Sequence, residues 1–175
     1  FSLMSPAEAI MWNKRSFQGD VSADMWASMK MELRRRPSYG DPGDINLTIC
    51  ADGKSLGSGY SLIFGGYDNT ATRLLRKGKI VAETTKYLAP ATRHRMPPMT
   101  GPEGLHRRWF HVAMKKRGDT IKCFLDESLL FKYVDPEPIT GDRVAAWTFD
   151  NGMMISRVRI SSENMGKHEF PLVAD

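Results

Sequence analysis

Carboxylates are the first residues to test for chemistry, because hydrolysis of a glycosidic bond needs two of them facing one substrate. No two of the eight glutamates are four positions apart, the spacing that would place a pair on one face of a strand. Asp20 and Asp24 have that spacing, but Asp20 belongs to a Gly19-Asp20 turn and Ser22 stands between them. The sequence therefore carries no paired-carboxylate motif, which favours a protein that is not an enzyme.

Histidine and cysteine show no pattern typical of a metal site or a nucleophile. The four histidines lack ligand spacing, and Cys50 and Cys123 are far apart with no Cys-x-x-Cys. No Gly-x-Ser-x-Gly elbow and no phosphate-cradling glycine loop is present. Strand parity turns Cys50 away from the core and Cys123 towards it, so we expect two separate thiols and no disulfide.

Trp26 is the foremost candidate for contact with a ligand. Every odd position over residues 21–33 is apolar, the period of two that a half-buried strand requires. The opposite face then carries Trp26 among polar residues: Ser22, Asp24, Ser28, Lys30 and Glu32. An aromatic ring in such a face is suited to stacking on a sugar ring while its neighbours bind the hydroxyls. The alternative, a loop that covers Trp26, fits the pattern equally well.

Four further residues are predicted to contact a ligand: Trp147, Tyr67, Asn69 and Arg73. Tyr67, Asn69 and Arg73 lie on or beside a turn and would suit the rim of a site. Trp147 belongs to a segment, residues 144–149, that is apolar on both faces, so a place in the core and a place in a groove both stay open. Trp109 and His111 are expected either to face solvent or to pack under a loop.

Short strands joined by turns must position these side chains. Alternation and turn signals predict strands over residues 21–33, 45–49, 60–64, 109–115, 120–125, 129–134, 144–149 and 155–160. Turns such as Lys77-Gly78-Lys79 and Arg117-Gly118-Asp119 favour hairpins. Only residues 5–11 are predicted to be helical, with Pro6 at the first helical position. Residues 88–105 are predicted to form a long loop that either borders a site or only crosses one end of the sandwich. These features predict an all-β antiparallel sandwich.

Length and charge set the wider limits. The 175 residues suit a single domain, with a core over about 12–161 and a polar tail over 162–175. The 25 basic and 20 acidic residues give a net charge of +5, and short basic clusters such as Arg34-Arg35-Arg36 and Lys115-Lys116-Arg117 fit either a polyanion partner or solvated strand ends. No nucleic-acid-binding motif accompanies them, so no nucleic-acid partner is expected. No apolar run approaches the roughly 18 residues of a membrane span, so no membrane insertion is expected.

Three stretches of the chain form a pattern when taken in order. The first is GYSLIFGG over residues 59–66, followed by Asn69 and Arg73. The second is WFHV over 109–112, with a Gly118-Asp119 turn and then LDE over 125–127. The third is GDRVAAWTF over 141–149, closed by ISRVRI over 155–160. This order resembles the concanavalin A-like lectin and glucanase superfamily, in particular its laminin-G-like jelly-roll domains.

The resemblance implies a jelly roll of two curved antiparallel sheets, with ligands on the outer face of the concave sheet and its rim loops. No cofactor is expected. Calcium is often present in this superfamily, so a structural calcium ion stays open as an alternative, with Asp20, Asp150 and Asn151 as the residues to inspect. The Glu-x-Asp-x-Glu motif of the laminarinase-type glucanases is absent here. By analogy, the protein is expected to be extracytoplasmic, either periplasmic or secreted.

The sequence thus predicts a non-catalytic carbohydrate-binding or adhesion-type module of a larger exported bacterial protein. Two alternatives stay open: a glycoside hydrolase-like enzyme of the same fold, and a structural or protein-interaction domain.

Overall fold

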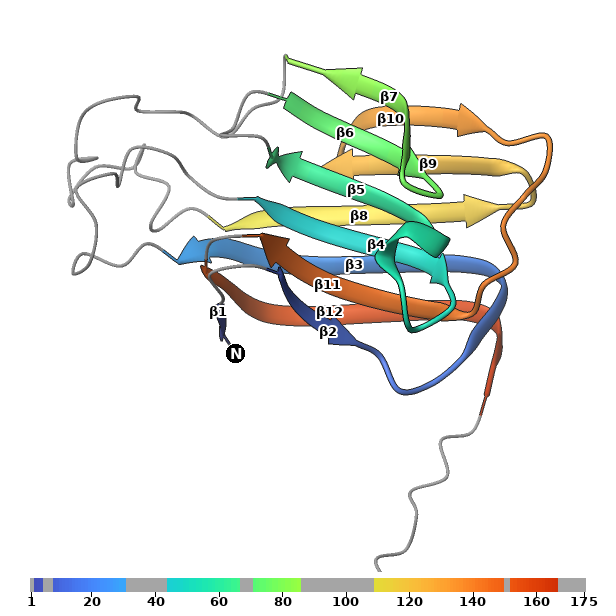
Figure 1. Ribbon diagram of the computed structural model, residues 1–175, viewed down its shortest axis with the longest axis horizontal. Coiled ribbons are helices and arrows are strands. Elements are labelled where there is room, and N and C mark those ends of the chain that lie inside the picture. The colour runs from blue at the N-terminus through green and yellow to red at the C-terminus, as the bar shows by residue number, and fades with distance from the viewer. Residues whose placement is uncertain are drawn as a thin grey trace, which may run out of the picture.

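The computed structural model describes residues 2–4, 8–30, 44–66, 71–85, 109–149 and 152–166. In these ranges the chain forms two antiparallel sheets, which overlap in the view of Figure 1. The strands of both sheets are aligned with roughly the same axis (Figure 1). A 3-10 turn, η1 (Leu56–Ser58), interrupts this all-β arrangement. The predicted antiparallel β-sandwich is confirmed.

The first sheet holds six strands in the order β1-β12-β3-β8-β9-β10. Their bounds are β1 (Ser2–Met4), β3 (Phe17–Lys30), β8 (Phe110–Arg117), β9 (Thr120–Leu125), β10 (Ser128–Val134) and β12 (Gly152–Met165). The second sheet has the order β2-β11-β4-β5-β6-β7. Its strands are β2 (Glu8–Trp12), β4 (Ile45–Ala51), β5 (Tyr60–Gly65), β6 (Ala71–Arg76), β7 (Lys79–Thr84) and β11 (Arg143–Phe149).

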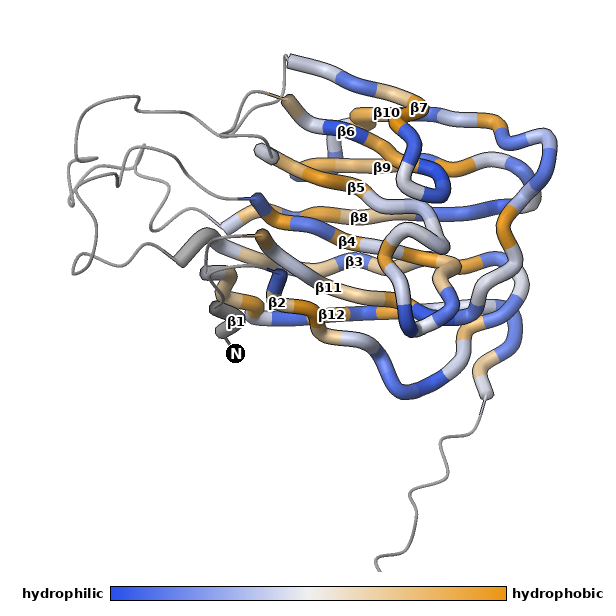
Figure 2. The backbone as a smooth tube through the Cα atoms, in the orientation of Figure 1, coloured by the Kyte–Doolittle hydropathy of each residue, from blue (hydrophilic) through white to orange (hydrophobic). Residues whose placement is uncertain are grey.

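The core lies between the sheets and is built by alternating side chains. In β3 the odd-numbered residues from Val21 to Ala27 are buried, as the period of two predicts, and polar and apolar residues alternate along the strands in Figure 2. Phe64 of β5 meets Phe110 of β8 across the sandwich, edge to face, with 5.0 Å between ring centroids. Burial of this layer fixes which face of each strand points outward.

Tight hairpins set the register of the strands. Lys77 and Gly78 both have positive φ (46° and 73°), the geometry of a type I′ turn between β6 and β7. Gly118 (φ 55°) turns β8 into β9, so that Lys115 lies opposite Lys122 and Ala113 opposite Phe124. Both turns were predicted from the sequence.

Three predictions about local structure are wrong. Residues 5–11 are not helical over their described part, because Glu8–Trp12 is a strand paired with β11 through Ile10↔Trp147 and Trp12↔Ala145. The predicted tail begins too early, since β12 continues to Met165, opposite Phe17. Cys50 joins the core instead of facing outward.

The position of Cys50 follows from its backbone. It adopts a left-handed conformation (φ 55°), and the pairing of β11 with β4 shifts between Arg143 and Ala145 at this point. Such an irregularity reverses the side of the sheet that the next side chain faces. Cys50 and Cys123 are separate free thiols, as predicted, and both are buried.

Candidate functional site

An aromatic pair lies on the outer face of the first sheet. Trp26 of β3 is directly opposite His111 of β8, and the two rings stack with 5.0 Å between centroids and 19° between planes. Parity points both side chains away from the core, because their strand neighbours Met25 and Phe110 are buried. Trp26 is 42% exposed, so the described residues leave its ring open to solvent.

A carboxylate holds this pair in place. Asp24, two residues before Trp26 on the same face, accepts a hydrogen bond from Arg159 Nε at 2.9 Å and lies 3.2 Å from Nε2 of His111. Burial raises the pKa of Asp24, but the bonds to Arg159 and His111 outweigh it and hold the pKa below its usual value. The carboxylate is therefore ionised at neutral pH. We call Trp26, His111, Asp24 and Arg159 the Trp26 patch.

The surroundings of the patch add further polar and aromatic groups. Arg157 of β12 is exposed and pairs with Trp26 in the register. Phe124 of β9 lies on the same face, with the Lys115 ammonium 5.1 Å from its ring centroid. Ser28, on the same face of β3 as Trp26, is fully buried, and its Oγ has no hydrogen-bond partner. An open aromatic plane is thus bordered by donors.

This arrangement is suited to binding. The indole can stack on the apolar face of a ring, while the exposed guanidinium of Arg159 can donate hydrogen bonds to hydroxyl groups. Each oxygen of Asp24 already has a partner, one Arg159 and the other His111. The patch therefore does not present Asp24 as a free acid or base.

Trp147 and Arg73 lie on the other sheet, away from the Trp26 patch. Trp147 is 7% exposed, packs with Ile63 and Ala145, and donates a hydrogen bond from Nε1 to Thr48 Oγ1 at 2.9 Å. Arg73 forms an ion pair with Glu83 on β7. We therefore leave both out of the candidate site. Tyr67 and Asn69 lie outside the described residues.

The predicted calcium ligands are only partly described. Asp20 accepts a hydrogen bond from the Gly118 backbone N–H at 2.7 Å, while Asp150 and Asn151 lie outside the described ranges. Across the residues that the structure describes, no three His, Cys, Asp or Glu side chains are grouped so as to hold a metal ion. A structural calcium ion stays an open alternative. Within the same ranges, no helix has the length and apolarity to cross a membrane.

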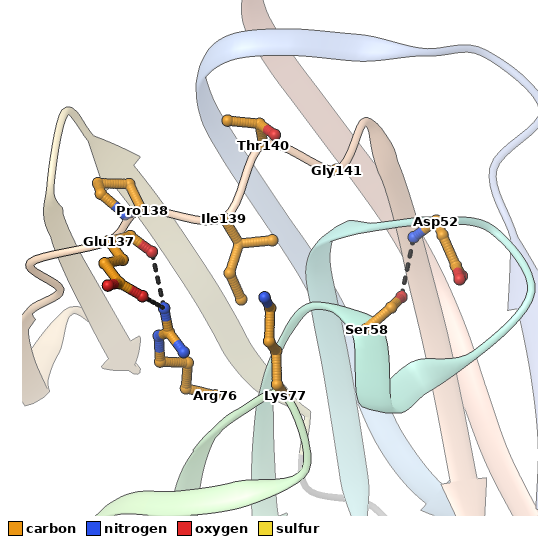
Figure 3. Close-up of a pocket in the computed structure, with 9 residues that line it drawn as sticks. All are labelled: Asp52, Ser58, Arg76, Lys77, Glu137, Pro138, Ile139, Thr140 and Gly141. Atoms are coloured by element: carbon orange, nitrogen blue, oxygen red, sulfur yellow. Dashed lines mark hydrogen bonds and ion pairs between the residues drawn. The ribbon is translucent and has the colours of Figure 1, made fainter.

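The structure also has a pocket that shares no residue with the Trp26 patch (Figure 3). This pocket of ≈ 490 Å³ lies between the η1 turn, the β6–β7 turn and the segment after β10, and its lining includes Asp52, Ser58, Arg76, Lys77 and Ile139. Much of its wall is already paired: Arg76 donates to Asp135 and to the Glu137 carbonyl, and Ser58 accepts from the Asp52 N–H. It offers no exposed aromatic plane.

Sequence reasoning found only part of the Trp26 patch. Strand parity placed Asp24 on the outward face beside Trp26, and it left His111 either facing solvent or packed under a loop. Arg159 could not be found, because only the antiparallel pairing of β12 with β3 brings it opposite Asp24.

Comparison with known proteins gives a fold and no close relative. No protein-family model matches the sequence, and no curated protein matches it. Among solved structures, the carbohydrate binding module CBM66 from Bacillus subtilis is similar, with a TM-score of 0.60 and 15% identity over 92% of this chain and 86% of that one. The VIP36 exoplasmic/lumenal domain in its Ca²⁺/Man-bound form has a TM-score of 0.60 and 12% identity over 92% and 77%. The Emp47p carbohydrate recognition domain has a TM-score of 0.57 and 10% identity over 91% and 82%.

At these identities the likeness shows the fold alone. The chain has the concanavalin A-like jelly-roll fold shared by lectins and glucanases, as the resemblance in its sequence implied.

Proposed function

We propose that this protein is a carbohydrate-binding module without catalytic activity, and that the Trp26 patch is its binding site. The observation that carries the proposal is the exposed indole of Trp26, stacked on His111 and bordered by Asp24 and Arg159. A rigid aromatic plane beside fixed polar groups matches the two faces of a sugar, one apolar and one rich in hydroxyls.

Burial supports the choice of this face. On the second sheet, the outward side chains of Asn46, Thr48 and Ile63 are 0–7% exposed, and Trp147 is also buried. The first sheet instead leaves Trp26 at 42% exposure, with its ring fixed by a neighbour. Because an ordered ring loses little conformational freedom on binding, the patch is prepared for a ligand.

The fold supports the same proposal. The similar structures include a carbohydrate binding module and a carbohydrate recognition domain. We extend the proposal to context: the chain acts as a binding module of a larger exported bacterial protein. The sequence that flanks it in its gene, read for a signal peptide or an adjoining catalytic domain, tests this second part.

A glycan array followed by titration calorimetry tests the binding site. Trp26→Ala removes the stacking plane, so we expect affinity for any glycan that binds to fall at least tenfold, which corresponds to about 1.4 kcal/mol. Phe149→Ala is the matched control, because Phe149 is 55% exposed and lies on the second sheet. Thermal unfolding of both variants shows whether the fold is retained.

Three results would contradict the proposal. Binding to no glycan would remove the function. If Arg73→Ala lost binding while Trp26→Ala kept it, the site would lie on the second sheet. Turnover of a bound sugar would show an enzyme.

A further inference from the structure

Three lysines form a single row across the first sheet. The register places Lys115 of β8 opposite Lys122 of β9, and Lys122 opposite Lys132 of β10. All three side chains are exposed, and parity points them to the same outer face as Trp26, since Met114, Cys123 and Phe131 beside them are buried. Strands about 4.8 Å apart thus present three positive charges over about 10 Å.

The row has no acidic counterpart on its own strands. No ion pair in the described part of the chain involves Lys115, Lys122 or Lys132. The acidic residues of β8–β10 are in turns at the strand ends: Asp119 between β8 and β9, and Asp126 and Glu127 between β9 and β10. Like charges directly opposite each other destabilise a sheet. The row therefore holds positive charge that the fold itself does not neutralise.

Arginines continue the positive charge past the Trp26 patch. Arg157 and Arg159 lie on β12, opposite Trp26 and Asp24, and both are exposed on the same face. Asp24, which the patch uses, neutralises part of the charge of Arg159. Acidic groups also occur at the far end of the face, where Asp20 accepts from Gly118 N–H and Glu163 accepts from Asp20 N–H. Between these points the face is basic from β12 to β10.

We propose that the glycan bound by the Trp26 patch is anionic, a polymer of uronic acid or sulfated sugars that crosses the strands from β12 to β10. This inference rests on the proposed function and adds the substrate class. One sugar ring stacks on Trp26, and the carboxylates or sulfates of the following residues meet Lys115, Lys122 and Lys132. Lysine suits this role because its ammonium is a mobile point charge that does not require one planar geometry.

The geometry favours a glycan over a nucleic acid. A single-stranded nucleic acid would need successive aromatic planes for its bases beside a track of positive charge. Here the row of lysines offers one aromatic neighbour, Phe124, which Lys115 already contacts. A sugar polymer needs one stacking plane and evenly spaced charges, which is what this face provides.

Titration calorimetry with polygalacturonate and its fully methyl-esterified form tests the inference, because the two polymers share one backbone and differ in charge. We expect binding to polygalacturonate only, weakening as salt rises. Dextran sulfate against dextran repeats the comparison for sulfate. Lys122→Gln should lower affinity for the anionic polymer about two- to fivefold. The triple change of Lys115, Lys122 and Lys132 to Gln should lower it more than tenfold, while Lys79→Gln, an exposed lysine of β7, should leave it unchanged.

Each contrary result has a distinct meaning. Equal affinity for charged and uncharged polymers, lost in Trp26→Ala, would overturn the anionic class and leave the proposed function standing. If Lys79→Gln lowered affinity for the anionic polymer as much as Lys122→Gln does, the effect would come from net charge alone, and the row of lysines would not be a site. Tighter binding of single-stranded DNA than of either anionic polymer would make this a nucleic-acid surface. Binding to no polymer of either charge, nor to any arrayed glycan, would remove the proposed function itself.

Discussion

Asp24→Asn is the change that separates the role of the Asp24 carboxylate from its size. The carboxylate faces two donors, Arg159 Nε at 2.9 Å and His111 Nε2 at 3.2 Å, and is only 7% exposed as a residue. Asparagine has the same shape but keeps one acceptor oxygen and turns an N–H towards a donor. The variant therefore releases either the guanidinium or the imidazole.

The size of the effect follows from burial. A hydrogen bond to a charged group contributes about 1.5–3 kcal/mol, but the Arg159 side chain is 61% exposed and solvent screens its half of the pair. We expect Asp24→Asn to destabilise the fold by about 1–2 kcal/mol, which lowers Tm by about 2–8 °C in a domain of this size. Because the variant no longer holds both Arg159 and His111 beside Trp26, glycan affinity should fall about three- to tenfold.

Calorimetric unfolding at several pH values tests the cause. The pKa of Asp24 is lowered in the folded state, so its contribution is complete above the ordinary value of 3.8 and is lost as pH falls through the folded pKa. The difference in Tm between wild type and Asp24→Asn should be full at pH 7 and should vanish in stronger acid. Asp119→Asn, in the exposed β8–β9 turn, is the control. An unchanged Tm and affinity at pH 7, or a difference that persists unchanged in acid, would refute the reasoning.

Two further predictions concern the interior. Tyr60→Phe removes a buried hydroxyl that donates a hydrogen bond to Asp135 Oδ2 at 2.5 Å and accepts one from the Ile139 N–H at 3.0 Å. Chemical denaturation should therefore show a free energy of unfolding that is lower by about 2–4 kcal/mol. A decrease of less than about 1 kcal/mol would contradict this hydrogen-bond network. Burial raises the pKa of Cys50 to about 11 and raises the pKa of Cys123 further. Neither thiol should therefore react with a thiol reagent at pH 8 until the protein unfolds. Rapid labelling of the native protein would contradict this expectation.

The fold was predictable where a strand is buried on one face, as β3 and β9 of the first sheet are. Alternation over residues 21–33 identified β3 and its inward stripe, and glycine turns located the β8–β9 hairpin. Two kinds of error remained. Residues 5–11 carry a helical start signal, but Ile10 and Trp12 pack on the second sheet, and this tertiary contact outweighs local propensity. Cys50 was misplaced because a left-handed residue breaks the parity on which the prediction depended.

The candidate site was predictable only within single strands. Parity exposed Trp26 and Asp24 together, since they share one strand. The partners of these residues come from β8 and β12, whose register depends on turns and on irregular pairing that the sequence alone does not specify, such as the shift between Ile155 and Arg157. Trp147 shows the limit most clearly: its segment is apolar on both faces, and only the packing with Ile63 decides that it is buried.

The row of lysines links binding to stability with opposite signs. Directly opposed like charges cost roughly 0.2–1 kcal/mol per cross-strand pair, and Lys122 belongs to two such pairs. Lys122→Gln should therefore raise the Tm of the free protein at low salt while it weakens binding to an anionic glycan. Added salt screens the repulsion and should remove the gain in Tm. If Lys122 served only solubility, its replacement would not weaken glycan binding. If Lys122 is a binding residue, its replacement should raise Tm and lower affinity together.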